Sequence, residues 1–280
     1  MFMKEEPSPV GQVAGAAGHV LTTIAFSHYV EKARWALERF GVPYVDHRYL
    51  PILHFAGVWA ATRGRGGRAD QVSTAYSTPV LKTPDGQMFY DSADIVRYAS
   101  QRFAPPSHDL YPDPEAAELE HRLGVQLGPH TRRAVYDAVF ADPGLLRDVG
   151  RRNVGAAQAA LFSVTLPVVV AVLRRGLAVN DQQVARSVES LRREMDAMSK
   201  RLADGRPYLL GDRFTAADLT LACMAAPVVA PGEYSAWIPS IDRLPEASQQ
   251  LIREQRETPA GRHALRMFQE ERRRVVGGAA

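Results

Sequence analysis

Residues 77–99 read STPVLKTPDGQMFYDSADIVRYA, and this stretch contains the clearest structural signals in the chain. The segments Pro79–Lys82 and Met88–Tyr90 flank Pro84-Asp85-Gly86-Gln87, a sequence typical of a tight turn between two strands. Ser92–Phe103 then carries apolar residues at helical spacing. The stretch therefore predicts a β-hairpin followed directly by a helix.

The residues before this hairpin predict two further strands and two helices. Val20–Phe26 is apolar and β-branched, as expected of a buried strand, and Tyr44–Leu50 is interpreted as a second strand. His28–Phe40 has a broad apolar stripe at helical spacing and is followed by Gly41, a typical helix end. A short helix is possible over His54–Thr62. This order builds a four-stranded mixed sheet with helices on both faces, an α/β domain.

The remainder of the chain has a different pattern. Ala104–Pro114 is rich in proline and has no periodicity, so it is interpreted as a linker. We expect an N-terminal arm over residues 1–18, an α/β domain over 19–103, the linker over 104–114 and an all-helical domain over 115–280. The predicted helices of this second domain are Glu115–Phe140, Asn153–Leu177, Asp181–Ala203, Ala216–Val229, Pro245–Glu257 and Pro259–Arg273.

Two segments of the helical domain carry specific signals. Val154–Leu173 is apolar over about the length of a membrane span, yet it contains several polar residues and Pro167. We interpret it as a buried central helix that is kinked or restarted at the proline, with a membrane-associated protein as the alternative. In Gly211–Ala222 (GDRFTAADLTLA), Thr215 and Asp218 have the spacing of a capping box at the start of a buried helix.

Composition bounds the function. The formal net charge of +3 is spread along 280 residues, which argues against a nucleic-acid or anionic membrane partner. Cys223 is the single cysteine and is interpreted as a small core residue, so a disulfide within the chain is impossible. With no secretory signal in residues 1–18, we expect a cytoplasmic protein.

Three short motifs could act together on one ligand. Ser27-His28-Tyr29 opens a helix, so the Ser27 hydroxyl lies where a helix N-terminus stabilises negative charge. Thr78-Pro79 enters a strand, and Asp91-Ser92 opens another helix, where an anion can bind. The simplest alternative is that Ser27 and Ser92 only cap their helices.

Three stretches together resemble the glutathione transferase superfamily, over roughly residues 20 to 270. They are FSHYVEKARWALERFGVPY (26–44), STPVLKTPDGQMFYDSADIVRYA (77–99) and GDRFTAADLTLA (211–222). The sequence is most similar to bacterial members and to the serine/cysteine-type classes. The resemblance implies a thioredoxin-like first domain, an all-helical second domain, glutathione as co-substrate, no metal, a homodimer and a role in detoxification.

The resemblance also implies roles for individual residues. Ser27 falls at the position of the catalytic serine or cysteine, where a hydroxyl donating to sulfur would favour the thiolate of glutathione. The Thr78-Pro79 bond should be cis and leave the Thr78 backbone free to pair with the cysteinyl unit. Ser92 would be both the helix N-cap and the donor to the γ-glutamyl carboxylate, with Asp91, or Asp94 one turn on, holding the amine.

Two positions depart from the family pattern. His28 replaces a common proline and is expected to be a surface histidine, although it could assist thiol deprotonation. Tyr76-Ser77 replaces residues that usually precede the Val/Thr-Pro step, which removes the usual partner of the glycyl carboxylate. Lys32, His54 or an arginine such as Arg63, Arg65 or Arg68 could substitute for that partner.

The second, electrophilic substrate should bind between the domains. The candidates for its site are Tyr29, Arg132, Arg133 and Tyr136. Conjugation, dehalogenation, ether cleavage and isomerisation share the same thiol activation, so the sequence does not separate these reactions. The alternative is a binding or regulatory protein that keeps the fold without turnover.

Overall fold

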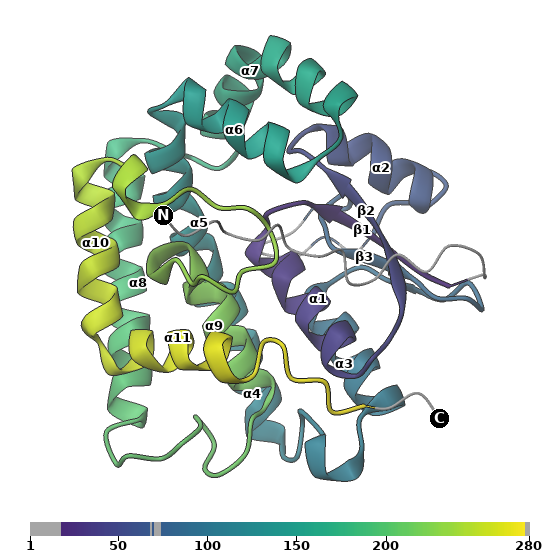
Figure 1. The fold of residues 1–280 in the computed structure, drawn as a ribbon, viewed down its shortest axis with the longest axis vertical. Coiled ribbons are helices and arrows are strands. Elements are labelled where there is room, and N and C mark those ends of the chain that lie inside the picture. Colours follow the sequence, from purple (N-terminus) through teal and green to yellow (C-terminus); the bar gives the residue numbers. More distant parts are fainter. Residues whose placement is uncertain (1–17, 68, 70–73, 278–280) are drawn as a thin grey trace, which may run out of the picture.

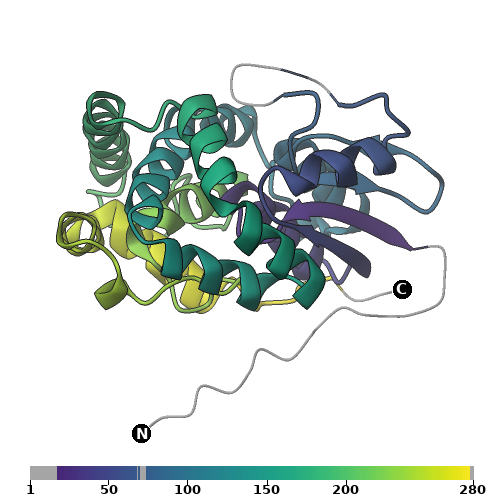
Figure 2. The same ribbon diagram turned by 90° about the horizontal axis from the view of Figure 1, so that it is seen from above.

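The computed structural model describes residues 18–67, 69 and 74–277, so the predicted arm over 1–18 lies almost wholly outside the described residues. Within this part of the chain a small sheet domain is followed by a helical domain (Figures 1 and 2). The strands are β1 (His19–Ile24), β2 (Tyr44–Tyr49), β3 (Val80–Lys82) and β4 (Met88–Phe89).

The four strands form one mixed sheet in the order β2-β1-β3-β4. Strands β1 and β2 are parallel, with His19 opposite Tyr44, whereas β3 runs antiparallel to both β1 and β4. The helices of this domain are α1 (His28–Arg39), α2 (Leu53–Ala61) and α3 (Ser92–Phe103). Helices α1 and α3 pack against each other, and α2 packs against β1 and β2 (Figure 1). This is the predicted α/β arrangement, a thioredoxin-like domain.

The helical domain has more helices than the sequence pattern predicts. Its helices are α4 (Pro114–Gln126), α5 (Gly128–Phe140), α6 (Pro143–Asn153), α7 (Ala156–Gly176), α8 (Asp181–Arg201), α9 (Ala216–Val229), α10 (Glu246–Glu257) and α11 (Pro259–Glu270), with short 3₁₀ turns η1 (Pro106–His108) and η2 (Ile241–Arg243). The single predicted helix over 115–140 is wrong, because the chain starts a new helix at Gly128-Pro129. Proline is tolerated in the first turn of a helix, because the N–H that it lacks would have no intrahelical acceptor at that position.

Helix α9 is the centre of the helical domain, and its start is specified locally as predicted. Asp218 Oδ2 accepts a hydrogen bond from the Thr215 N–H at 3.0 Å, and the Thr215 side chain accepts one from the Asp218 N–H, and these two bonds form the capping box. Cys223 lies fully buried in this helix, and burial raises the pKa of its thiol well above its ordinary value. Cys223 is therefore an apolar core residue, as expected.

Helix α7 contradicts the prediction of a buried central helix. It is long and apolar enough to cross a membrane by length and composition, but it lies at the outside of the fold and is mostly exposed (Figure 1). Leu166 and Val169 are buried, whereas Val164 and Val168 are exposed. Because its apolar residues surround the whole helix, only one side can pack on the domain. The helix also continues through Pro167 as one element, so of the two expected effects of this proline, a kink or a restart, the restart does not occur.

The segment after α11 returns to the sheet domain and packs against α1. Glu271 Oε2 pairs with Arg39 Nη1 at 2.8 Å, and Arg272 pairs with both Glu31 and Glu38 at 2.6 Å. All but Glu38 are buried, so these ion pairs compensate charges that would be costly to bury alone. They hold the two domains together on the side of α1 that faces α11.

Candidate functional site

A cavity of about 580 Å³ lies where the two domains meet. The sheet domain contributes the turn between β1 and α1, the entry to β3 and the start of α3, and the helical domain contributes parts of α5 and α7. This interdomain cavity falls in the size range typical of small-molecule sites. Of the site residues predicted from the sequence, it brings together Ser27, Tyr29, Thr78, Pro79, Asp91, Ser92, Arg132, Arg133 and Tyr136.

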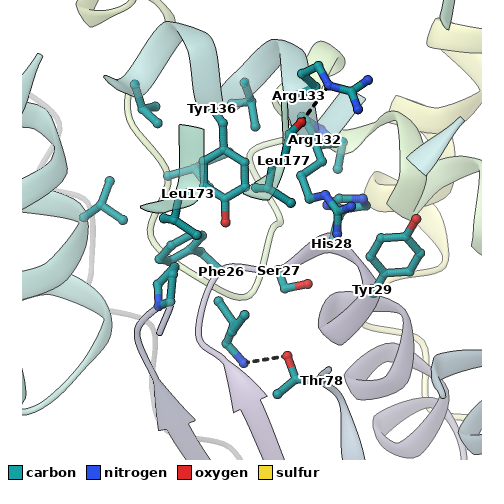
Figure 3. A pocket seen from close by; sticks show the side chains of 18 of the residues that line it. Phe26, Ser27, His28, Tyr29, Thr78, Arg132, Arg133, Tyr136, Leu173 and Leu177 are labelled. Carbon is teal, nitrogen blue, oxygen red and sulfur yellow. Dashed lines mark hydrogen bonds between the residues drawn. The ribbon is translucent and has the colours of Figure 1, made fainter. Parts of the chain in front are cut away.

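Ser27 is the residue before α1 and lines the cavity (Figure 3). Its backbone is extended, with φ −71° and ψ 131°, and its hydroxyl makes no capping hydrogen bond to the helix. The alternative that Ser27 only caps α1 is therefore not supported. A hydroxyl placed at the positive end of a helix and left free of the cap can donate to an anion in the cavity.

The Thr78-Pro79 peptide bond is cis, as predicted. The Thr78 hydroxyl accepts a hydrogen bond from the Ile24 N–H at 3.2 Å, which ties the residue to the end of β1 (Figure 3). Both Thr78 and Pro79 line the cavity, beside the strand edge that β3 begins. The Thr78 side chain is thus occupied by the protein, and its main chain lies where an extended peptide could add to the sheet.

The start of α3 differs from the prediction in one detail. Asp91, not Ser92, is the N-cap, because the Asp91 Oδ1 accepts from the Ala93 N–H at 2.6 Å. Ser92 is the first helical residue and is buried, with 3% of its surface exposed, at the cavity wall. The sequence analysis expected Ser92 as the N-cap, but serine and aspartate cap helices equally well. The correction leaves the Ser92 hydroxyl uncommitted to the cap.

His28 is buried, so the expectation of a surface histidine is wrong. Its Nε2 lies 3.2 Å from the carbonyl oxygen of Gly128, where a proton on Nε2 donates to the carbonyl. Burial, with a smaller contribution from Arg132, lowers the pKa of His28 to about 3. The histidine is therefore neutral at physiological pH and a poor base for a thiol.

Tyr29 lines the cavity but uses its hydroxyl for structure. The hydroxyl donates to the carbonyl oxygen of Gly124 at 2.8 Å, in helix α4. His28 and Tyr29 are thus both bonded to the junction between α4 and α5. The residues next to Ser27 fix the orientation of the two domains at the site.

Arg132, Arg133 and Tyr136 lie on α5 and form the opposite wall (Figure 3). Arg133 donates from Nε to the Leu177 carbonyl oxygen at 2.9 Å, the dashed line in Figure 3. The Tyr136 hydroxyl points into the cavity, while its ring stacks on Phe140. Burial raises the pKa of Tyr136, so its hydroxyl stays protonated and can donate.

Lys32 does not belong to this site. Its Nζ pairs with Glu120 at 2.7 Å, both side chains are buried, and Lys32 is not one of the described residues that line the cavity. Burial of a lysine is tolerated when a carboxylate compensates the charge. The prediction that Lys32 binds a ligand carboxylate is therefore not supported.

His54, at the start of α2, takes a place that the sequence left open. It lines the cavity and is buried, with 7% exposed, and its Nδ1 has no hydrogen-bond partner among the described residues. Burial lowers the pKa of His54 to about 4. An imidazole in this state is neutral and has one nitrogen that can donate to a ligand.

Sequence reasoning missed the contribution of the segment after α9. Tyr234 and Trp237 line the cavity, and the Tyr234 hydroxyl donates to the Phe26 carbonyl oxygen at 3.1 Å, one residue before Ser27. The only signal was two aromatic residues in a stretch without helical periodicity. In the part of the chain that is described, no cluster of three histidine, cysteine or acidic residues could hold a metal ion.

Two family models match the sequence. The Glutathione S-transferase, N-terminal domain model matches residues 21–107, and the Glutathione S-transferase, C-terminal domain model matches residues 181–248. No protein of curated function matches the chain.

Solved structures share the fold at low sequence identity. A glutathione S-transferase of Ceriporiopsis subvermispora in complex with glutathione is 20% identical, with a TM-score of 0.57, covering 94% of this chain and all of that one. A glutathione transferase of Phanerochaete chrysosporium is 18% identical, with a TM-score of 0.60, over 90% of this chain and 96% of that one. A glutathione S-transferase of Methylobacillus flagellatus with glutathione bound is 18% identical, with a TM-score of 0.53, over 93% and 100%.

Proposed function

Because the chain belongs to the glutathione S-transferase superfamily, we propose that it is a serine-type glutathione transferase that delivers the glutathione thiolate to an electrophile. The observation that carries the proposal is the free Ser27 hydroxyl at the start of α1, inside the interdomain cavity. The cis Thr78-Pro79 bond and the α3 N-terminus line the same cavity. The reaction type is left at this level, because the residues named act before the electrophile reacts.

The chemistry of thiol activation follows from charge. A thiol with a pKa of about 8.5 is mostly protonated at neutral pH, and the thiolate is the nucleophile. A hydrogen bond from Ser27 to sulfur, together with the N-terminal end of α1, favours the anion. A decrease of about two pKa units corresponds to about 2.7 kcal/mol. The thiol proton leaves to solvent, and the sulfur lone pair forms the new S–C bond as the leaving group departs.

Glutathione would be held by three parts of the sheet domain. The Thr78 backbone would pair with the cysteinyl unit, and Ser92 with the α3 N–H groups would bind the γ-glutamyl carboxylate. Asp91, the one acidic side chain among the described lining residues, would attract the amine. We assign the glycyl carboxylate to His54, whose burial beside the cavity and unpaired Nδ1 support it better than Lys32.

Ultraviolet difference spectroscopy of the thiolate band tests the proposal. Bound glutathione should show thiolate absorption at neutral pH in the wild-type protein and lose it in Ser27→Ala, while calorimetry still detects binding. Ser92→Ala is the matched control, since it should weaken binding without changing the spectrum of the bound ligand. Tight binding with no thiolate band in the wild type would instead support the alternative, a non-catalytic binding protein.

Three expectations that accompany the family stay predictions: a homodimer, a cytoplasmic location and a role in detoxification. Sedimentation of the purified protein measures the first directly.

A further inference from the structure

The charges that line the interdomain cavity are separated by sign. Asp91 lies on the wall made by the sheet domain, and Arg132 and Arg133 lie on the wall made by α5. Among the described lining residues these are the charged groups, because burial keeps His28 and His54 neutral. The α5 wall is therefore positively charged, and Asp91, the one acid among the described lining residues, lies on the other wall.

Arg133 is held in place by neutral acceptors. Its Nε donates to the Leu177 carbonyl oxygen at 2.9 Å and its Nη1 to the Ser187 hydroxyl oxygen at 2.6 Å. Burial and the neighbouring Arg132 both lower the pKa of Arg133. The effect of Arg132 is that expected for two neighbouring cations with no carboxylate between them. The hydrogen bonds orient Arg133 and leave its positive charge uncompensated.

Arg132 has a different environment. No ion pair in the described part of the chain involves its guanidinium, and its charge acts on its neighbours His28 and Arg133, neither of which is an acid. A half-buried guanidinium with no anionic partner is partly desolvated without compensation, and an anion bound in the cavity would supply that compensation. The Tyr136 hydroxyl, one turn further along α5, points into the same space and adds a neutral donor (Figure 3).

We propose that the second substrate is an amphipathic anion, whose apolar body packs on the α5 and α7 side chains and whose carboxylate or sulfonate pairs with Arg132. This inference rests on the proposed function and deepens it. The two carboxylates of glutathione are assigned to the sheet-domain wall, so an anion that pairs with Arg132 would come from the other reactant. A planar guanidinium suits such a group, since it can donate two parallel hydrogen bonds to it.

A pair of fluorescent probes with one apolar body tests the proposal without glutathione. Anilinonaphthalene sulfonate carries a sulfonate, and phenylnaphthylamine is its uncharged counterpart. The Arg132→Met variant should bind the sulfonate roughly tenfold or more weakly, because a charge-assisted hydrogen bond is lost, and should bind the neutral probe with unchanged affinity. The matched control is Arg186→Met, an exposed arginine of α8 outside the cavity lining, which should leave both affinities unchanged.

Two results would overturn the inference. Equal affinity of wild type and Arg132→Met for the sulfonate would show that the anion binds elsewhere, for example on the exposed face of α7. An equal loss for both probes would show that Arg132 only maintains the shape of the cavity. Neither experiment contains glutathione, so failure of thiol activation in the Ser27 test is distinguishable from failure here.

Discussion

His28 Nε2 lies 3.2 Å from the carbonyl oxygen of Gly128, and this contact joins the two domains one residue away from Ser27. The carbonyl can only accept, so Nε2 carries the proton and Nδ1 is unprotonated. A histidine fixed in this tautomer acts as a structural donor. The contact therefore argues against a role for His28 as a base toward a ligand held by Ser27.

The buried state of His28 predicts a loss of stability in acid. Its pKa is about 3 in the folded protein and about 6.5 in the unfolded chain, so below about pH 6.5 only the unfolded chain takes up the proton. Stability should fall by about 1.4 kcal/mol per pH unit from this group as the pH decreases. The free energy of unfolding can be measured with urea at about pH 7.5 and about pH 5. Between these values it should decrease by roughly 2 kcal/mol less in His28→Gln than in wild type. His121→Gln, at an exposed position of α4, is the control and should behave like wild type. An equal decrease of the unfolding free energy in His28→Gln and wild type would contradict the role assigned to His28.

Two glycines at the α4–α5 junction should respond oppositely to alanine. A Cβ on Gly128 would overlap the Tyr29 hydroxyl and lie 2.7 Å from Met224 Sδ, whereas a Cβ on Gly124 meets nothing within 4 Å. Gly128→Ala should therefore lower the free energy of unfolding by about 1–3 kcal/mol. Gly124→Ala should raise it by about 0.5–1 kcal/mol, because alanine favours a helix interior. Urea unfolding of both variants decides the matter, and two changes of the same sign would refute it.

The buried ion pair between Arg272 and Glu31 should contribute far more to stability than an exposed pair. Arg272→Met leaves Glu31, which is fully buried, without its guanidinium partner and should cost about 3–5 kcal/mol in urea unfolding. Adding Glu31→Gln should recover part of that loss, since it removes the unpaired charge. Arg192→Met, in the exposed pair with Glu254, should cost at most about 1 kcal/mol. Similar losses in the two single variants would exclude a special role for the buried pair.

The two tyrosines of the cavity should separate stability from catalysis. Tyr136→Phe removes a hydroxyl that faces the cavity and should change the free energy of unfolding by less than about 0.5 kcal/mol. It should lower kcat/KM about three- to tenfold for an electrophile whose reacting group accepts a hydrogen bond. Tyr29→Phe removes the bond to Gly124 and should instead cost about 0.5–1.5 kcal/mol of stability. Steady-state kinetics of Tyr136→Phe equal to wild type would remove the hydroxyl from the reaction.

What the sequence predicted correctly was encoded locally. The turn at Pro84–Gln87, the cis bond at Thr78-Pro79 and the capping box at Thr215 each depend on residues within a few positions of one another. The order of strands and helices in the first domain followed from the same short-range signals. The prediction of Ser92 as N-cap was wrong even so, because the preceding Asp91 suits that role equally well and only the backbone geometry distinguishes the two positions.

What the sequence did not predict depends on partners distant in the chain. His28 is buried because it bonds to Gly128, which lies 100 positions further along the chain. Lys32 does not reach the site because it pairs with Glu120. The sequence also could not predict that α7 is exposed to solvent. A helix that is apolar on every side has no periodicity to indicate which side is buried. Charged residues in α1 read as solvent-facing in a sequence, yet most of them are buried against the second domain.

The return of the chain to α1 also sets an order of events during synthesis on the ribosome. Glu31 is translated early, but the guanidinium that neutralises it belongs to a residue 241 positions later. Until Arg272 has been synthesised, Glu31 lacks this ion-pair partner on the surface of the sheet domain that later packs against the helical domain. In the first domain expressed alone, Glu31 would remain without Arg272.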